Sequence, residues 1–174
     1  RLSDQIIEEK GLPNYDPLSY GGRDIHDLML WPILIAGLGI LLRGDVLLAS
    51  KILPFIFGIG SFIIFYFLLK RFKIPNKIIF LSLLMLIISS PFLYLSGVST
   101  PYSAATFFIL LGLLLFFKEN KTYFFFSGVS FLMVIFFSLP LLLVFLPILF
   151  FVTVINDRNK LKSFLFIFLF IVTT

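Results

Sequence analysis

The feature that most constrains this chain is a series of long apolar segments without charge. Residues 52–69, 78–117 and 122–156 contain no Asp, Glu, Lys or Arg. Hydrophobic residues make up 60% of the chain and charged residues 13%, outside the range of soluble globular proteins. Strand-like alternation of apolar and polar residues is absent, which argues against an outer-membrane barrel. The sequence therefore predicts an all-α, polytopic transmembrane helical bundle.

Residues 46–174 are expected to form the transmembrane helical region. Turns and prolines divide it into expected spans at 46–69, 78–96, 102–117, 123–139 and 140–155. A last span begins near residue 163, and we expect the chain to be a fragment of a longer protein. The second span contains Ser89-Ser90-Pro91, where serine hydroxyls are expected to bond backbone groups that the proline frees. Gly58 and Gly60 favour close packing between helices.

The loops between the apolar segments predict the orientation of the chain. Basic residues occupy alternate loops, namely Lys70/Arg71/Lys73/Lys77, Lys118/Lys121 and Arg158/Lys160/Lys162. The loops between them, at 97–101 and 138–140, carry no charge. The positive-inside rule places the basic loops in the cytoplasm and the uncharged loops outside. We expect a multi-pass integral membrane protein, in the plasma membrane of a prokaryote. Because the positive charges lie in these short loops, nucleic-acid binding is not expected.

Residues 1–45 are expected to form a polar, external first loop that bears short amphipathic or re-entrant helices. Apolar residues spaced among charges predict a short helix at 1–10, and the segment 14–22 is rich in turn-forming residues. The apolar run 28–42 reaches about 22 Å as a helix, against a hydrocarbon core of roughly 30 Å. It is either a re-entrant or interfacial helix or a tilted short span. Its shortness, and the excess of acids over cations in 1–27, favour placing residues 1–27 outside, on the same face as the loop 97–101.

The first loop also contains the polar side chains that suit chemistry, among them the only His of the chain. Carboxylates serve as general bases or metal ligands, guanidinium groups bind phosphate in a bidentate manner, and aromatic rings stack on sugars. The candidate catalytic residues are Asp24 and Asp27, and the candidate substrate-binding residues are Arg1, Tyr20, Arg23 and His26. A simpler interpretation assigns the aspartates to a solvated loop that caps the next helix, and assigns the arginines and Tyr20 to the membrane interface.

The run RLSDQIIEEKGLPNYDPLSYGGR resembles the first external loop of archaeal oligosaccharyltransferase catalytic subunits and of the wider GT-C superfamily of membrane glycosyltransferases. The matching positions are Arg1, Gly11, Pro13, Asp16, Pro17, Tyr20, Gly22 and Arg23. The Pro-containing segment 28–42 before a long span and the short loop 96–102 also fit. In oligosaccharyltransferases the second external loop carries acids, whereas 96–102 has none. This difference favours a GT-C relative, or a diverged member of unknown activity, over a metal-dependent oligosaccharyltransferase.

The resemblance implies transfer of a sugar or oligosaccharide from a polyprenyl-phosphate-linked donor. The acceptor would be a protein or a glycan, the reaction would take place at the external face, and a divalent metal such as Mg²⁺ or Mn²⁺ would take part. The chemistry requires a cation near the departing phosphate and a carboxylate near the acceptor.

Two other functions remain open on sequence grounds: a polytopic transporter or flippase-like protein, and a non-catalytic membrane scaffold. A transporter is expected to show ionisable residues at membrane depth or paired broken helices. The absence of charge from the apolar segments argues against an ion-coupled carrier.

Overall fold

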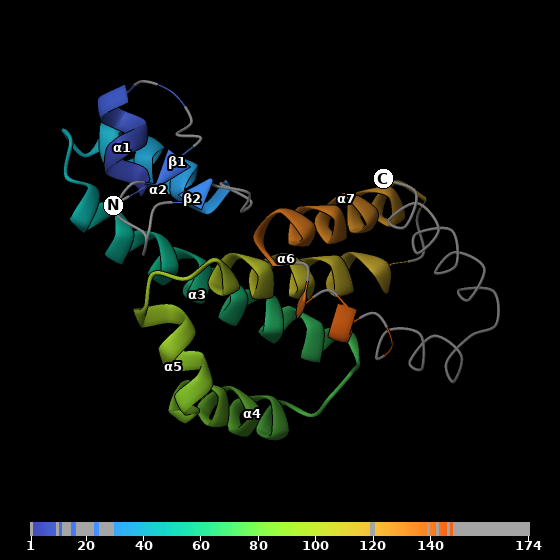
Figure 1. Cartoon of the computed structure of the whole chain (residues 1–174). Coiled ribbons are helices and arrows are strands. Elements are labelled where there is room, and N and C mark those ends of the chain that lie inside the picture. Colours follow the sequence, from blue (N-terminus) through green and yellow to red (C-terminus); the bar gives the residue numbers. More distant parts are fainter. Residues whose placement is uncertain are drawn as a thin grey trace.

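The computed structural model describes residues 2–9, 11, 15–16, 23–24, 30–118, 121–138, 140–141, 143–145 and 147. The regular secondary structure in this part of the chain is helical except for one short antiparallel pair of strands (Figure 1). The elements are α1 (Leu2–Glu9), β1 (Tyr15–Asp16), β2 (Arg23–Asp24), α2 (Leu30–Leu41), α3 (Val46–Arg71), α4 (Asn76–Ile88), α5 (Ser90–Gly97), α6 (Pro101–Phe116) and α7 (Lys121–Phe137). The all-α prediction is thus confirmed for the described residues. The spans expected at 140–155 and beyond residue 163 lie largely outside them.

Helix α3 runs through the middle of the molecule and is the longest of the described elements (Figure 1). The turn Arg43–Gly44 precedes it, with both residues at positive φ, so the apolar run of α2 ends there as expected. Asp45 then caps α3, because its Oδ1 accepts a hydrogen bond of 2.8 Å from the backbone N–H of Leu48. With 26 residues, α3 is about 39 Å long. It is long and apolar enough to cross a membrane.

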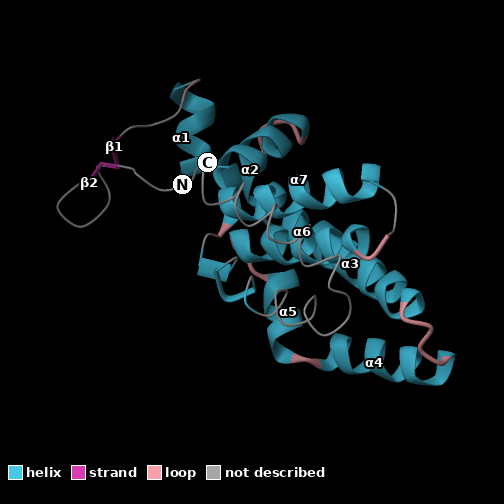
Figure 2. Cartoon of the chain, turned by 90° about the vertical axis from the view of Figure 1, so that its right-hand side faces the viewer, coloured by secondary structure: helices cyan, strands magenta, loops and turns pink. Residues whose placement is uncertain are grey.

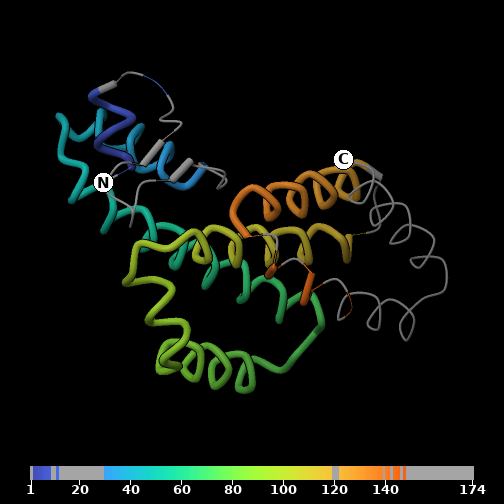
Figure 3. Tube along the Cα trace, viewed as in Figure 1, coloured from blue at the N-terminus to red at the C-terminus, as the bar shows by residue number. Residues whose placement is uncertain are grey.

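The span expected at 78–96 is broken in the structure. Its two halves, α4 and α5, are bent by 62° at Ser89, and together they are also apolar and long enough to cross (Figure 3). Pro91 lies in the first turn of α5, where its missing N–H costs least. The hydroxyl of Ser89 donates to Leu86 O at 3.0 Å, and the Ser89 N–H donates to the same carbonyl at 3.2 Å. In a continuous helix the N–H of residue 91 would donate to Ile87 O, so this bond is not made to the group that Pro91 frees, as the sequence had predicted, but to the end of α4.

Helices α6 and α7 are apolar, but at 16 and 17 residues they are shorter than α3. As straight helices they reach about 24 and 26 Å, somewhat less than the hydrocarbon core. Figure 2 shows α3, α6 and α7 packed together, with α4 on the far side of α3 from α7. The exposed surface of α3 and α4 is apolar, with 40–70% of many large side chains accessible, among them Phe55, Ile56, Ile59, Ile63, Phe80, Leu81, Met85 and Ile88. Exposed apolar area of this extent is typical of a surface that contacts lipid or a partner.

Three glycines allow the helices to approach closely. A Cβ added at Gly58 would lie 2.6 Å from Ser96 Cβ of α5, and one added at Gly60 would lie 2.6 Å from Phe107 Cε2 of α6. The packing role expected for these two glycines is confirmed. Gly112 of α6 makes a third such contact with Phe131 of α7. Across the same interface, the Ser127 hydroxyl donates to Gly112 O at 2.8 Å.

The core contains aromatic side chains that join α2 to the longer helices. Trp31 of α2 lies 6.0 Å from Phe57 of α3 and 6.4 Å from Phe137 of α7, measured between ring centroids. Phe108 of α6 stacks on Phe137 at 5.6 Å. Such ring pairs stabilise a fold beyond the area that they bury. Since Trp31 is only 6% exposed, α2 belongs to the same core as α3, α6 and α7, and this core extends across the boundary expected at residue 45.

Candidate functional site

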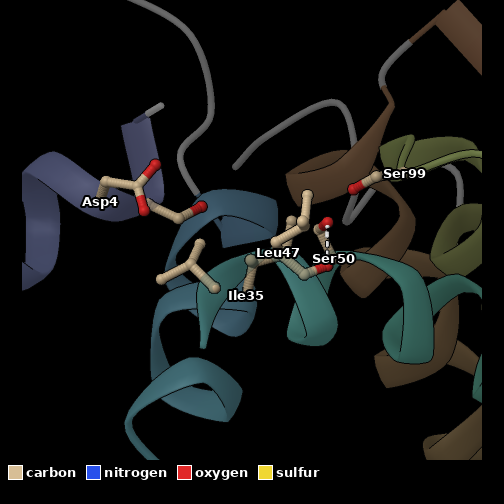
Figure 4. Close-up of a pocket in the computed structure, with 7 residues that line it drawn as sticks. Asp4, Ile35, Leu47, Ser50 and Ser99 are labelled. Carbon is tan, nitrogen blue, oxygen red and sulfur yellow. Dashed lines mark hydrogen bonds between the residues drawn. The ribbon is translucent and has the colours of Figure 1, made fainter. Parts of the chain in front are cut away.

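A pocket of about 240 Å³ lies where α1, α2, the start of α3 and the loop between α5 and α6 meet (Figure 4). It is lined by Ser3, Asp4, Ile35, Val46, Leu47, Ser50 and Ser99. It therefore offers a carboxylate and three hydroxyls together with branched apolar side chains. A pocket of this composition can hydrogen-bond a hydroxyl-rich group while an apolar part of the ligand packs beside it. Its volume is below the roughly 300–1,000 Å³ typical of drug-sized ligands, so its described part suits a smaller ligand.

Helix α1 brings Ser3 and Asp4 to the pocket by packing on α2. Ile7, on the expected apolar face of α1, reaches α2 at Gly39, where a Cβ would lie 3.6 Å from Ile7 Cδ1. With Ile7 in this contact, Ser3 is buried at 6% exposure, whereas Asp4 is exposed at the mouth of the pocket. Figure 4 shows the Asp4 carboxylate on α1, across the pocket from Ser99. The amphipathic helix expected at residues 1–10 is thus confirmed, and it contributes directly to the pocket.

The other wall is fixed by two local structures. In the first turn of α3, the Ser50 hydroxyl donates to Leu47 O at 2.8 Å, as drawn in Figure 4. Ser99 lies in the loop that follows α5, where Val98 and Thr100 are extended and the Thr100 N–H donates to Val98 O at 2.8 Å. Pro101 then begins α6, because its fixed φ suits a first helical turn. Ser99 is therefore held between two helices and is exposed to the pocket.

Three buried side-chain atoms in the described part of the chain have no hydrogen-bond partner there: Gln5 Oε1, Trp31 Nε1 and Thr100 Oγ1. Two of them belong to residues that directly follow pocket residues, since Gln5 comes after Asp4 and Thr100 after Ser99. A buried polar atom without a partner costs about 1–3 kcal/mol of stability, and none of these three residues lines the pocket itself.

The structure describes the predicted site residues only in part. The backbone of Arg23 and Asp24 forms β2, which pairs antiparallel with β1 so that Tyr15 is opposite Asp24 and Asp16 is opposite Arg23. Strand β1 lies within the segment 14–22, where the sequence predicted turns and no strand. The side chains of Arg23 and Asp24, and the whole of Arg1, Tyr20, His26 and Asp27, lie outside what the structure describes.

The pocket residues Ser3, Ser50 and Ser99 were not predicted from sequence. The loop containing Ser99 and the first helix had been expected to share a face, and they do line one pocket. No spacing signal identifies the serines, because they come from three separate elements. As for a metal, no group of three or more His, Cys, Asp or Glu residues is placed to hold an ion within the described ranges, where the pocket supplies the single carboxylate of Asp4.

No protein-family model matches the chain, and neither curated proteins nor solved structures gave a match. Within its described residues, the structure defines a helical protein in which α3 is long and apolar enough to cross a membrane, as is the bent pair α4 and α5 if it forms a single span.

Proposed function

We propose that this protein is a polytopic membrane glycosyltransferase of the GT-C type. It transfers a sugar from a polyprenyl-phosphate-linked donor to a protein or glycan acceptor at the external face. The observation that carries the proposal is the pocket between α1 and the loop at Ser99, because it joins the first loop, which carries the GT-C resemblance, to the second. Its carboxylate and hydroxyls suit a sugar, and Ile35, Val46 and Leu47 suit the start of an isoprenoid chain.

In the proposed reaction, the bond between the anomeric carbon and the phosphate oxygen breaks, and a bond to the acceptor's nucleophilic atom forms. The acceptor proton passes to a carboxylate, for which Asp24 or Asp27 is the candidate. The negative charge leaves on the polyprenyl phosphate, where Arg1 or Arg23 stabilises it. The lining residues of the described pocket include no cation, so phosphate binding is assigned to these two arginines. Asp4, Ser3, Ser50 and Ser99 then bind the sugar hydroxyls.

The test is sugar transfer by the full-length protein in membranes, with a polyprenyl-phosphate-linked donor. Asp24→Asn is expected to lower the rate by about 100-fold or more, the usual contribution of a general base. Asp4→Asn keeps the size of the side chain but removes a charged acceptor, and is expected to lower the rate about tenfold. Glu8→Gln is the matched control, since Glu8 is an exposed acid on the same helix that does not line the pocket. Equal rates for Asp4→Asn and Glu8→Gln would show that the pocket takes no part in sugar transfer. Unchanged rates for both Asp24→Asn and Asp27→Asn would show that neither aspartate accepts the proton of the acceptor.

One observation favours a second candidate function, that of a transporter. The 62° break between α4 and α5 is the kind of broken helix that places backbone groups near a transported ligand. A transporter returns a labelled lipid-linked sugar unchanged on the other side of a vesicle, whereas a glycosyltransferase gives a new covalent product. Analysis of the product in the same vesicles therefore separates the two functions.

A further inference from the structure

A second pocket, of about 400 Å³, lies at the opposite end of α3, between its last turn and the end of α6. It is lined by Phe67, Lys70, Arg71, Leu114 and Lys118, and so combines three cations with two apolar side chains. The proposed sugar-transfer reaction does not use this pocket. The question is what such a pocket binds.

Among the described residues, the hydrogen-bond and cation–π partners of the three cations carry no negative charge. The Arg71 guanidinium donates from Nη2 to Phe117 O at 3.1 Å, at the C-terminal end of α6. The Lys118 ammonium lies 3.9 Å from the centre of the Tyr123 ring, and Lys70 lies 5.9 Å from that of Tyr66. A carbonyl and aromatic rings orient cations without neutralising them. Within the described ranges no carboxylate lines this pocket, while Glu119, next to Lys118 in the sequence, lies outside them.

The pocket has a polar and an apolar layer because of helical spacing. Phe67 lies three and four residues before Lys70 and Arg71 in α3, whereas Leu114 is in the last turn of α6 and Lys118 lies two residues beyond the end of that helix. Residues three and four apart lie on one face of a helix, so Phe67 lies one turn deeper than Lys70 and Arg71, and Leu114 precedes Lys118 at the helix end. Phe67 remains 49% exposed in this position. A ligand that satisfies both layers carries an anion at one end and a hydrocarbon chain at the other.

We propose that this pocket binds an anionic glycerophospholipid of the cytoplasmic leaflet. The phosphate of the headgroup contacts Lys70, Arg71 and Lys118, and the beginning of an acyl chain covers Phe67 and Leu114. Basic pockets between helices at the cytoplasmic surface take anionic headgroups in this way. A free phosphate would satisfy the cations but leave the apolar layer exposed. The inference requires that the protein spans the membrane, but it does not depend on sugar transfer.

The experiment measures which lipid stays bound to the full-length, detergent-purified protein. The protein is incubated with equal amounts of phosphatidylglycerol and phosphatidylcholine that have identical acyl chains, and bound lipid is counted by native mass spectrometry at physiological salt. The wild-type protein is expected to retain phosphatidylglycerol. Each cation near the surface contributes about fivefold in affinity, so Lys70→Gln/Lys118→Gln is expected to lower phosphatidylglycerol binding by about 25-fold.

The matched control is Lys73→Gln/Lys77→Gln, which removes the same charge from the same end of the molecule but from outside the pocket. Charges that do not contact the bound headgroup are partly screened by salt, so a change of no more than about threefold is expected. Lys70→Arg/Lys118→Arg keeps the charges and is expected to keep binding. Fluorescence of the single Trp31 reports whether each variant is folded. Equal losses in the two Gln double variants would show general attraction to an acidic surface, and would overturn the assignment of a site.

Two further results would also overturn the proposal. One is a wild-type protein that shows no preference for phosphatidylglycerol. The other is displacement of the lipid by glycerol phosphate at equal concentration, because this would show that the site recognises a soluble phosphate and does not use the apolar layer. Failure of sugar transfer in any variant leaves these readouts unaffected, so the two proposals are tested separately.

Discussion

The contact between Gly112 and Phe131 allows a quantitative test of how α6 and α7 pack. A Cβ at residue 112 would lie 2.7 Å from Phe131 Cε1, 2.9 Å from Cζ and 3.0 Å from Cδ1. Carbon atoms in good contact are about 3.5–4.0 Å apart, so the ring would have to move by well over half an ångström. Phe131 is fully buried, as is Val134 one turn further along α7, so the ring has little space to move into. We therefore expect Gly112→Ala to be destabilising.

Overpacking of this kind typically costs about 1–3 kcal/mol. The replacement also makes the helix intrinsically more favourable, by about 0.8–1 kcal/mol. Gly128→Ala separates the two effects, because Gly128 lies in α7 with nothing within 4 Å of an added Cβ. Both variants gain the helical preference, but only Gly112→Ala meets the ring. Its free energy of unfolding is therefore expected to be about 1–3 kcal/mol below that of Gly128→Ala.

The assay is thermal unfolding in detergent, followed by the fluorescence of Trp31. This is the only Trp of the chain, it is 6% exposed, and it contacts Phe137 of α7. For a chain of this size, about 2–4 °C of Tm corresponds to 1 kcal/mol, so Tm values about 2–12 °C apart are expected. Adding Phe131→Leu to Gly112→Ala removes ring atoms from the contact and is expected to recover part of the loss. Identical Tm values for the two alanine variants would refute the close approach of α6 and α7.

Two further predictions follow from described residues. Asp45→Ala removes the cap of α3 and is expected to lower the stability by about 1 kcal/mol in the same Trp31 assay, whereas Asp45→Asn, an equally good cap, is expected to preserve it. Since the chain has no Cys, Ser99→Cys and Asn76→Cys introduce single labelling sites at two exposed positions. In intact cells a membrane-impermeant thiol reagent is expected to label Ser99→Cys only; labelling of Asn76→Cys from outside would contradict the orientation inferred from the basic loops.

Periodicity and turn chemistry predicted most of the described helices. The expected helix at 46–69 corresponds to α3, the expected helix at 102–117 corresponds to α6, and Arg43–Gly44 ends α2 because both residues adopt positive φ. These features depend on neighbouring residues, so the local sequence contains the information. The direction that the chain takes after Ser89 could not be predicted from neighbouring residues in this way. The sequence indicates a weak point there, but the 62° bend depends on how α5 packs against α3 at Gly58.

The candidate site was predictable only at the level of segments. A family resemblance singled out the first loop, and charge alternation placed the loop at Ser99 on the same face. The individual residues Ser3, Ser50 and Ser99 were not predictable, because a serine gives no periodic signal and these three meet only through tertiary packing. The aromatic core had the same limitation. Among 25 Phe, nothing in the sequence distinguishes Phe108 and Phe137, which stack, from those that face outward.

Both proposals depend on the orientation of helix α3 in the membrane, because each pocket includes one of its ends. The candidate sugar site includes its first turn, at Val46–Ser50, and the basic pocket includes its last, at Phe67–Arg71. Ser50 and Phe67 are separated by about 26 Å along a helix, close to the thickness of the hydrocarbon core. If α3 crosses the membrane, the two pockets therefore lie at opposite surfaces. An outside location of Ser99 then requires a cytoplasmic location for Lys70 and Arg71, where anionic lipid is concentrated. The reverse orientation would move the sugar site to the cytoplasm and the basic pocket to the outer surface, so the labelling experiment bears on both proposals at once.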